Sequence, residues 1–320
     1  MRFSAFTRRG RAAVAIAAAL LLALSACSSS SSPGKKTSPT SAPSGTALFP
    51  TVKGSYGVKP TLTFANANPS KSLQVKVLSE GTGPVVTKGQ LLIADYLGQI
   101  WRGKVFDNSY DRKEPIATPI GLGAVIKGWD DGLVGKKVGS RVLLVIPPAD
   151  GYGSAGSSGA GIKGTDTLAF VIDLVSTYSK TDIGDTKAVP QTVSTAPVTV
   201  TGALGAEPKV TVAKGAALPT AAKTVVLAKS TGAPTKAGFV VLQYEAEYYN
   251  NTLADSTFQR GQPQATAVGV SGQANPFDGV IGVPIGSRVL ITTPVQDTEG
   301  STTGVAIVAD IIAQSGPAKP

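Results

Sequence analysis

Histidine is absent from the 320-residue chain, and cysteine and methionine occur once each. Without histidine, a Ser-His-Asp triad, a histidine general base and a histidine metal site are all excluded. A single cysteine allows neither an internal disulfide nor a cysteine metal cluster. The sequence also has no P-loop and no G-x-G-x-x-G motif between a strand and a helix, so nucleotide binding has no support. We therefore expect no metal, no cofactor and no covalent catalysis.

Charged side chains are also scarce, at 16% of the residues. The 30 Lys and Arg residues outnumber the 20 Asp and Glu residues, which gives a formal net charge of +10. Residues 1–27 hold four arginines and no acid, so the rest of the chain carries 26 − 20 = +6. The remaining basic residues are interleaved with acids. The positive excess favours an anionic membrane or cell wall, but it is dispersed along the chain, so we predict no nucleic-acid patch.

The N-terminus has the pattern of a bacterial secretion signal. An arginine-rich start precedes the uncharged run 12–26, which is shorter than the roughly 20 residues that span a bilayer. The run ends in Leu-Ser-Ala-Cys27, which resembles a lipobox. We expect residues 1–27 to be a lipoprotein signal peptide and Cys27 to carry the lipid, so that the protein is extracytoplasmic and anchored to the cell membrane. A plain secretion signal is the alternative, and Arg8-Arg9 leaves the export route open between the general secretory and twin-arginine pathways.

Residues 28–55 are rich in Ser, Pro, Thr, Gly and Lys, which predicts a flexible tether. The chain after it contains a long internal duplication. The segment GSRVL occurs at 139–143 and again at 286–290. Residues that recur at an offset of 148 positions include the pairs Tyr96/Tyr244, Asp107/Asp255 and Arg112/Arg260. We predict domains at 56–180 and 197–316, separated by a linker at 181–196 that is rich in Thr, Asp, Pro and Ser.

Each copy consists mainly of apolar, β-branched segments with turn residues between them, which predicts an antiparallel sheet with one face covered. The strands predicted in the first copy are 73–78, 91–96, 141–146 and 168–175, and those in the second are 224–228, 240–244, 288–292 and 305–312. The only helix predicted in the first copy is VIKGWDDGL at 125–133. Gly128 and Gly132 each cost a helix roughly 1 kcal/mol, so the flanking strands must support it.

Five segments of the first copy share their order and nearly their spacing with one known family. They are ADYLG at 94–98, KVFDNS at 104–109, VIKGWDDGL at 125–133, GSRVLLVIPPADGYG at 139–153 and TLAFVIDLV at 167–175. Together they resemble the FKBP-type peptidyl-prolyl isomerases. The resemblance implies an α+β fold with two FKBP-like domains, each a half-barrel sheet around one short helix. It also implies proline-containing polypeptides as substrates and macrolide inhibitors as ligands.

The resemblance also assigns roles to residues of the first copy. Trp129 is expected to form the pocket floor, and its walls are expected to be Tyr96, Phe106, Val125, Ile126 and Phe170. The Tyr152 hydroxyl and the Ile126 backbone N–H are expected to donate to substrate carbonyls. Asp107 is expected to orient a hydrogen bond at the pocket edge, and Arg112 to pair with Asp107 or Tyr96.

Two alternatives accompany this hypothesis. The aromatic residues taken singly suit a core, but Asp107 beside Phe106, and Tyr152 in a Gly-Tyr-Gly loop, favour a pocket. The second alternative is a non-catalytic chaperone or peptide-binding lipoprotein. Departures from the family at Ile116, Thr118, Asp150 and 154–164 leave open both the residue preference before proline and the affinity for macrolides.

The second copy departs further from the family pattern. Ala254 stands at the position of Phe106, and the tryptophan segment becomes ANPFDG at 274–279. Between a strand-ending proline and the last strand's aspartate, the first copy has 173 − 147 = 26 positions and the second 310 − 294 = 16, so Tyr152 has no equivalent. We predict a degenerate domain without isomerase activity. Phe277 partly refills the floor, which leaves peptide binding and a structural spacer as alternatives.

From these observations we predict a membrane-tethered isomerase that accelerates the folding of exported proteins at the outer face of the cell membrane.

Overall fold

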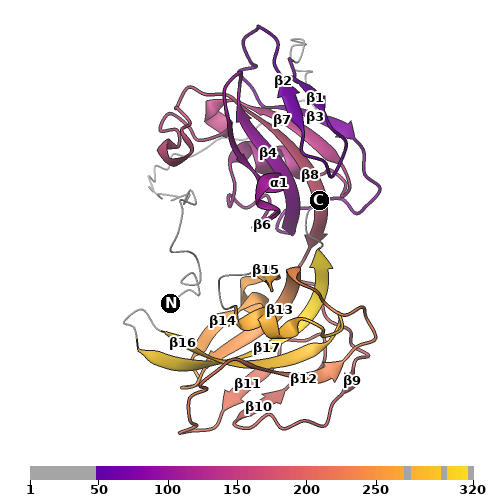
Figure 1. Ribbon diagram of the computed structural model, residues 1–320, viewed down its shortest axis with the longest axis vertical. Helices are drawn as coiled ribbons and strands as arrows, with labels where there is room; N and C mark the ends of the chain where they lie inside the picture. Colours follow the sequence, from indigo (N-terminus) through magenta and orange to yellow (C-terminus); the bar gives the residue numbers. More distant parts are fainter. Residues whose placement is uncertain (1–47, 270–274, 297–300, 316–320) are drawn as a thin grey trace, which may run out of the picture.

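The computed structural model describes residues 48–269, 275–296 and 301–315, and Figure 1 shows their arrangement. The predicted signal peptide, Cys27 and residues 28–47 of the predicted tether lie outside the described residues. Two antiparallel sheets dominate, and the helices are short, which fits the α+β class. Within the described residues, no helix is both long and apolar enough to cross a membrane.

The first sheet has the strand order β3-β7-β8-β4-β5, and β6 also pairs with β4. A two-stranded hairpin, β1–β2, lies beside it. The bounds of these strands are β1 Thr51–Lys53, β2 Thr61–Thr63, β3 Gln74–Ser79, β4 Leu91–Ile100, β5 Val105–Asn108, β6 Ile116–Pro119, β7 Arg141–Ile146 and β8 Leu168–Tyr178. The helices are α1 Ser109–Arg112 and α2 Lys127–Leu133, with two 3₁₀ turns, η2 Pro148–Asp150 and η3 Ser158–Ala160.

Helix α2 confirms the predicted helix, although it begins two residues later. Its two glycines, which weaken a helix, are explained by how closely it approaches β7. A Cβ added to Gly128 would lie 2.6 Å from a side-chain carbon of Ile146, and one added to Gly132 would lie 2.7 Å from Leu144. Trp129 and Leu133 are therefore pressed into the core under the sheet.

The second sheet repeats this order of neighbours as β14-β13-β17-β16-β12-β9, with β15 beside β13 and the hairpin β10–β11 nearby. Its strands are β9 Val189–Pro190, β10 Val198–Thr201, β11 Lys209–Val212, β12 Lys223–Lys229, β13 Gly238–Tyr248, β14 Leu253–Ser256, β15 Gln264–Val268, β16 Arg288–Gln296 and β17 Thr302–Ser315. Helix α3 Thr257–Arg260 and the 3₁₀ helix η4 Pro276–Val280 complete it. All eight predicted strands occur, and most extend beyond their predicted bounds.

Two predicted boundaries differ from the structure. Thr51–Lys53, at the end of the predicted tether, forms strand β1, and Phe49 and Val52 pack against a buried cluster that includes Leu62. In the predicted linker, Val189–Pro190 forms β9 and pairs with β12. The composition of these two segments did not predict strands. They are strands because they contact residues that are distant in the sequence.

A buried arginine–aspartate pair fastens each hairpin to its sheet. In the first sheet, Arg141 donates to both carboxylate oxygens of Asp173, at 2.6 and 2.7 Å. The same guanidinium donates to the carbonyls of Gly54 and Val58, at 2.6 and 2.7 Å, in the turn that joins β1 to β2. Arg141 also donates to the Tyr110 hydroxyl at 3.2 Å. Because Arg141 is only 1% exposed, its charge is compensated by these protein partners and not by solvent.

Arg288 and Asp310 repeat this arrangement in the second sheet. Arg288 donates to the two carboxylate oxygens at 2.6 and 2.8 Å. It also donates to the carbonyls of Ala203 and Ala206, at 3.0 and 2.8 Å, between β10 and β11. The arginine of each GSRVL segment thus connects a hairpin to its sheet in the same way.

We predict that Arg141→Ala lowers the free energy of unfolding by about 3–5 kcal/mol, because Asp173 is left buried and uncompensated. Both tryptophans, at 101 and 129, lie in the first domain, so their fluorescence reports its unfolding in urea. Lys59→Ala is the control. It removes an exposed ion pair with Asp111 and should cost far less than the loss of the buried pair. Equal losses in the two variants would refute the role of the buried pair.

Candidate active site

Four aromatic rings meet between α2 and the inner face of the first sheet. Trp129 contacts Phe170 of β8 and Tyr96 of β4 edge to face, with both centroid distances at 5.4 Å. Phe106 of β5 contacts Phe170 in the same way at 5.5 Å. Edge-to-face contacts place the positive ring edge against the negative face of the next ring, so the cluster holds each ring in a defined orientation.

These rings divide into a buried base and an accessible rim. Trp129 is 3% exposed, and Tyr96 and Phe170 are also buried. The rim residues are half-buried and pack against the same core: Phe106, Val125, Ile126 and Tyr152. The structure thus brings together every residue predicted for the pocket. Among the described residues, no hydrogen-bond partner reaches the buried Trp129 indole N–H.

A polar network joins the edge of the aromatic cluster. The Tyr96 hydroxyl donates to Asp107, and Arg112 forms an ion pair with the same carboxylate. Arg112 also donates to the Tyr96 hydroxyl oxygen at 3.0 Å, with its guanidinium 5.7 Å from the ring centre. The sequence analysis expected Arg112 to pair with either Asp107 or Tyr96, and Arg112 contacts both.

Helix α1 positions Arg112 and was missed by the sequence analysis. The Asn108 side chain caps it by accepting the Asp111 N–H at 2.8 Å, and Lys113 ends it in the left-handed conformation at φ 53°. This single turn carries Arg112 back toward Asp107. The asparagine followed three residues later by an aspartate was the signal available for an N-terminus.

Gly98 is a second residue that the sequence analysis missed. It lies in β4, where a Cβ would come within 2.6 Å of the Phe106 ring and 2.7 Å of the Phe170 ring. Phe106 is the extra residue of a β-bulge, because Asp107 pairs with Gly98 and Val105 with Gln99. The bulge and the missing side chain together let the Phe106 ring lie over the strand.

The comparisons with known proteins concern this part of the chain. Residues 83–175 match the profile of the family described as FKBP-type peptidyl-prolyl cis-trans isomerase. The FK506-binding protein of Streptomyces anulatus is 42% identical over 118 residues, which are 37% of this chain and 95% of that protein. The FK506-binding protein of Neisseria meningitidis serogroup A is 40% identical over 107 residues, 33% of this chain and 97% of its own. The chain belongs to the FKBP-type peptidyl-prolyl cis-trans isomerase family.

The protein is therefore a peptidyl-prolyl cis-trans isomerase. One solved structure in the family, the crystal structure of AtFKBP13, is 37% identical with a TM-score of 0.31, covering 33% of this chain and 93% of that one. In the isomerase described here, no group of three or more Asp, Glu, Cys or His residues within the described ranges is arranged to hold a metal.

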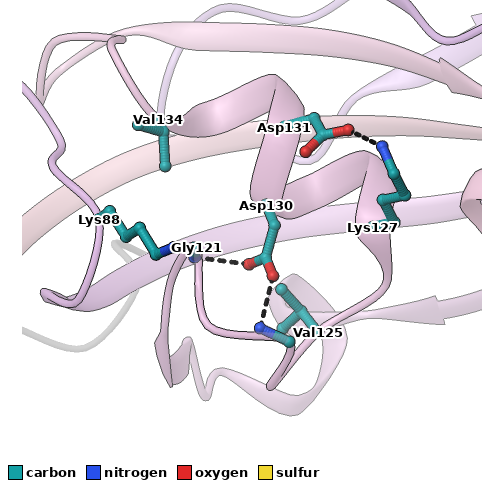
Figure 2. Close-up of a pocket in the computed structure, with 8 residues that line it drawn as sticks. Lys88, Gly121, Val125, Lys127, Asp130, Asp131 and Val134 are labelled. Carbon is teal, nitrogen blue, oxygen red and sulfur yellow. Dashed lines mark hydrogen bonds and ion pairs between the residues drawn. The ribbon is translucent and has the colours of Figure 1, made fainter. Parts of the chain in front are cut away.

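An open pocket of about 660 Å³ is lined by Val125, Asp130 and Val134, among other residues (Figure 2). Asp130 of α2 lines the pocket and accepts the N–H groups of Gly121 and Gly123, at 2.6 and 2.7 Å. This carboxylate fixes the loop that leads into Val125 and Ile126. Asp130 thus holds the loop before Val125 in place, a role that the sequence analysis did not assign although the residue lies in the segment VIKGWDDGL.

The second domain keeps the polar edge of the site and loses its aromatic base. The Tyr244 hydroxyl donates to Asp255 at 2.7 Å, and Arg260 forms an ion pair with Asp255. The same hydroxyl also bonds to Gln264 at 2.9 Å. Phe277 is the one ring in contact with Tyr244 among the described residues, at 5.4 Å, and it is buried.

We predict that the isomerase activity is nearly independent of pH, changing by less than about twofold between pH 6 and 9. Burial, followed by the hydrogen bond to Asp107, raises the pKa of Tyr96 above its usual value near 10. Burial, followed by the charge of Asp107, also raises the pKa of Tyr152. A raised phenol pKa keeps the donating, protonated form present throughout this range. A bell-shaped profile of kcat/KM centred near neutrality would contradict the assignment.

Proposed function

We propose that the first domain isomerises X-Pro bonds in exported polypeptides at the outer face of the cell membrane and thereby accelerates their folding. The observation that carries this proposal is the aromatic cluster with the Tyr96–Asp107–Arg112 network at its edge. The cluster offers an apolar surface for a pyrrolidine ring. The network keeps one boundary of that surface polar and fixed, as a site that orients a substrate requires.

Catalysis follows from preferring the twisted amide. The X-Pro bond rotates over a barrier of about 18–20 kcal/mol because its C–N bond loses conjugation on the way. In the twisted state the peptide carbonyl depends less on hydration, so a dry site discriminates in its favour. Each 1.36 kcal/mol of preference for that state over the planar isomers gives about a factor of ten in rate.

The roles of the residues follow from their burial. The proline ring contacts the half-buried rim residues Phe106, Val125 and Ile126, while Trp129 and Phe170 support them from below. The Tyr152 hydroxyl and the Ile126 N–H donate to substrate carbonyls. Asp107 accepts from Tyr96, and Arg112 holds both, so the site needs no reorganisation when the amide twists.

We propose that the second domain is a diverged FKBP-like copy without catalytic activity. The repeated strand order and the second Arg–Asp pair support a common fold. Three changes argue against catalysis. Ala254 stands at the position of Phe106, the Tyr244 hydroxyl is hydrogen-bonded to Gln264, and the second copy has no counterpart of Tyr152.

A matched pair of variants tests which domain acts. Tyr96→Phe removes the hydroxyl that joins Asp107 and Arg112, and Tyr244→Phe removes the equivalent one in the second domain. The Tyr96 hydroxyl makes two hydrogen bonds. At about 0.5–1.5 kcal/mol for each, Tyr96→Phe should lower kcat/KM by at least about two- to tenfold. Tyr244→Phe should retain full activity. The measurement is isomerisation of a proline peptide, with proline-limited refolding of a protein as a second readout.

If neither variant changes the rate, the assigned site is wrong. If the wild-type chain binds proline peptides but does not accelerate their isomerisation, a peptide-binding or chaperone role replaces catalysis. The macrolide FK506 gives an independent probe, since several relatives are named FK506-binding proteins. We propose that FK506 occupies the same rim, and it should then compete with the peptide substrate.

We also propose that Cys27 carries a lipid and that residues 28–47 tether the folded part to the membrane. The lipobox-like Leu-Ser-Ala-Cys27 and the Ser- and Pro-rich composition support this proposal. Cys27→Ser should release the protein into the medium, because a thioether-linked lipid cannot form on serine. Fractionation measures the outcome. A Cys27→Ser protein that stays in the membrane fraction as the wild type does would rule out this anchor.

A further inference from the structure

An apolar cluster lies between the two domains. Its fully buried members are Ile93 of β4 and Val241 of β13, each 0% exposed, and Leu91 joins them. The residues packed around them are Ala117, Val175, Tyr178, Ala265, Ile312 and Ala313. Figure 1 shows the first sheet above the second, with β6 of the first and β15 of the second at the junction. The side chain of Gln262 adds a hydrogen bond across the junction, donating to the Gly89 carbonyl at 3.1 Å.

Most residues of this junction occupy equivalent positions on its two sides, whereas Leu91, Tyr178 and Ala313 have no equivalent in the cluster. Ile93 and Val241 are 148 positions apart, as are Ala117 and Ala265. Ala117 pairs with Ile93 in the first sheet, and Ala265 pairs with Val241 in the second. An interface in which the same patch meets itself is isologous, and it relates its two halves by a twofold axis.

Matching β-bulges contribute one further residue from each side. In the first sheet Ile93 pairs with Ser176 and Ala94 with Leu174, which leaves Val175 unpaired. In the second sheet Val241 pairs with Ala313 and Leu242 with Ile311, which leaves Ile312 unpaired. A bulge turns its extra residue out of the regular alternation. Both extra residues belong to the interdomain cluster.

The junction uses the face of each sheet that lies opposite its inner core. Successive residues of a strand point to opposite faces. In β4, Leu92, Ala94 and Tyr96 belong to the core that contains Trp129, whereas Leu91 and Ile93 belong to the junction. Contact between the domains therefore leaves the isomerase site uncovered.

The chain between the domains is itself attached to the second sheet. Gln243 donates to the Lys180 carbonyl at 3.0 Å, and Ser230 donates to Asp185 at 2.7 Å. The Asp185 N–H donates to the Gly286 carbonyl at 2.9 Å. Two domains joined by a free linker would be expected to move independently. Here the linker offers little length for such motion.

We propose that the two domains are locked as a pseudo-twofold pair through this self-complementary face, so that the second domain acts as a rigid arm and not as a tethered module. The partner that the face fits is the equivalent face of a second copy, which the duplication supplies within one chain. The arm fixes the direction in which the isomerase pocket opens relative to the second domain.

Distance measurement between spin labels tests the lock in the full-length chain. Cys27 is the only cysteine, so the Cys27→Ser protein accepts labels only at engineered positions. Thr63 of β2 and Thr211 of β11 are equivalent, exposed strand residues and suit Thr63→Cys and Thr211→Cys. Pulsed electron paramagnetic resonance should give one narrow distance peak. A broad distribution would overturn the proposal.

Ala117→Asp combined with Ala265→Asp tests the face itself, because both side chains are half-buried and lie on the two equivalent sides. The labelled distance should become broad in this variant and stay narrow in the control Thr199→Asp, which changes an exposed residue of β10. If the folded double variant keeps the narrow peak, this interface is not what holds the two domains rigid, and the proposal is refuted. If the double variant does not fold, Gln262→Ala replaces it, with the same two outcomes. Isomerase activity does not enter the test, so its result is independent of the proposed function.

Discussion

The buried pair of Arg141 and Asp173 is the interaction on which the geometry of the first domain depends. The two charges lie on the outer face of β7 and β8 and are shielded from water. Hydrogen bonds from neighbouring polar groups therefore have to replace their hydration. Asp173 accepts the Gly57 N–H at 2.7 Å and the Tyr110 hydroxyl at 2.9 Å, in addition to its bonds from Arg141. Tyr110 belongs to α1, which also carries Arg112 to the pocket edge. The pair thus connects the hairpin, the sheet and the active site.

The duplication shows which parts of this design tolerate change. Both copies keep the Arg–Asp pair and the tyrosine–aspartate–arginine network, which fix strands and the first helical turn. The aromatic base changes in a coordinated way. In the first copy, the Phe106 ring fills the space that Gly98 leaves open. In the second copy, Ala254 stands at the position of Phe106 and Ala246 at the position of Gly98. The lost ring volume is thus partly replaced by a methyl group on the neighbouring strand, and the framework survives without the pocket.

Periodicity and composition predicted the parts of the structure that local sequence determines. Strands such as Arg141–Ile146 and the helix around Trp129 were found because each presents a continuous apolar face. Helix α1 was missed because four residues are too few for a periodic pattern. Strand β1 was assigned to the tether because its order comes from the Arg141 bonds to the β1–β2 turn, which no nearby residue indicates. The roles of Gly98 and the bulged Val175 were not predicted for the same reason, because both depend on neighbours in other strands of the sheet.

A proline residue of the substrate is expected to bind above Trp129, and the indole N–H groups of the two tryptophans allow a direct test. Trp101 donates its indole N–H to the Ala67 carbonyl at 3.2 Å, whereas the Trp129 indole N–H has no partner within the described residues. Titration of the ¹⁵N-labelled protein with a proline peptide should shift the Trp129 indole resonance and leave that of Trp101 in place. A Trp129 resonance that stays unchanged while the peptide binds would contradict the account.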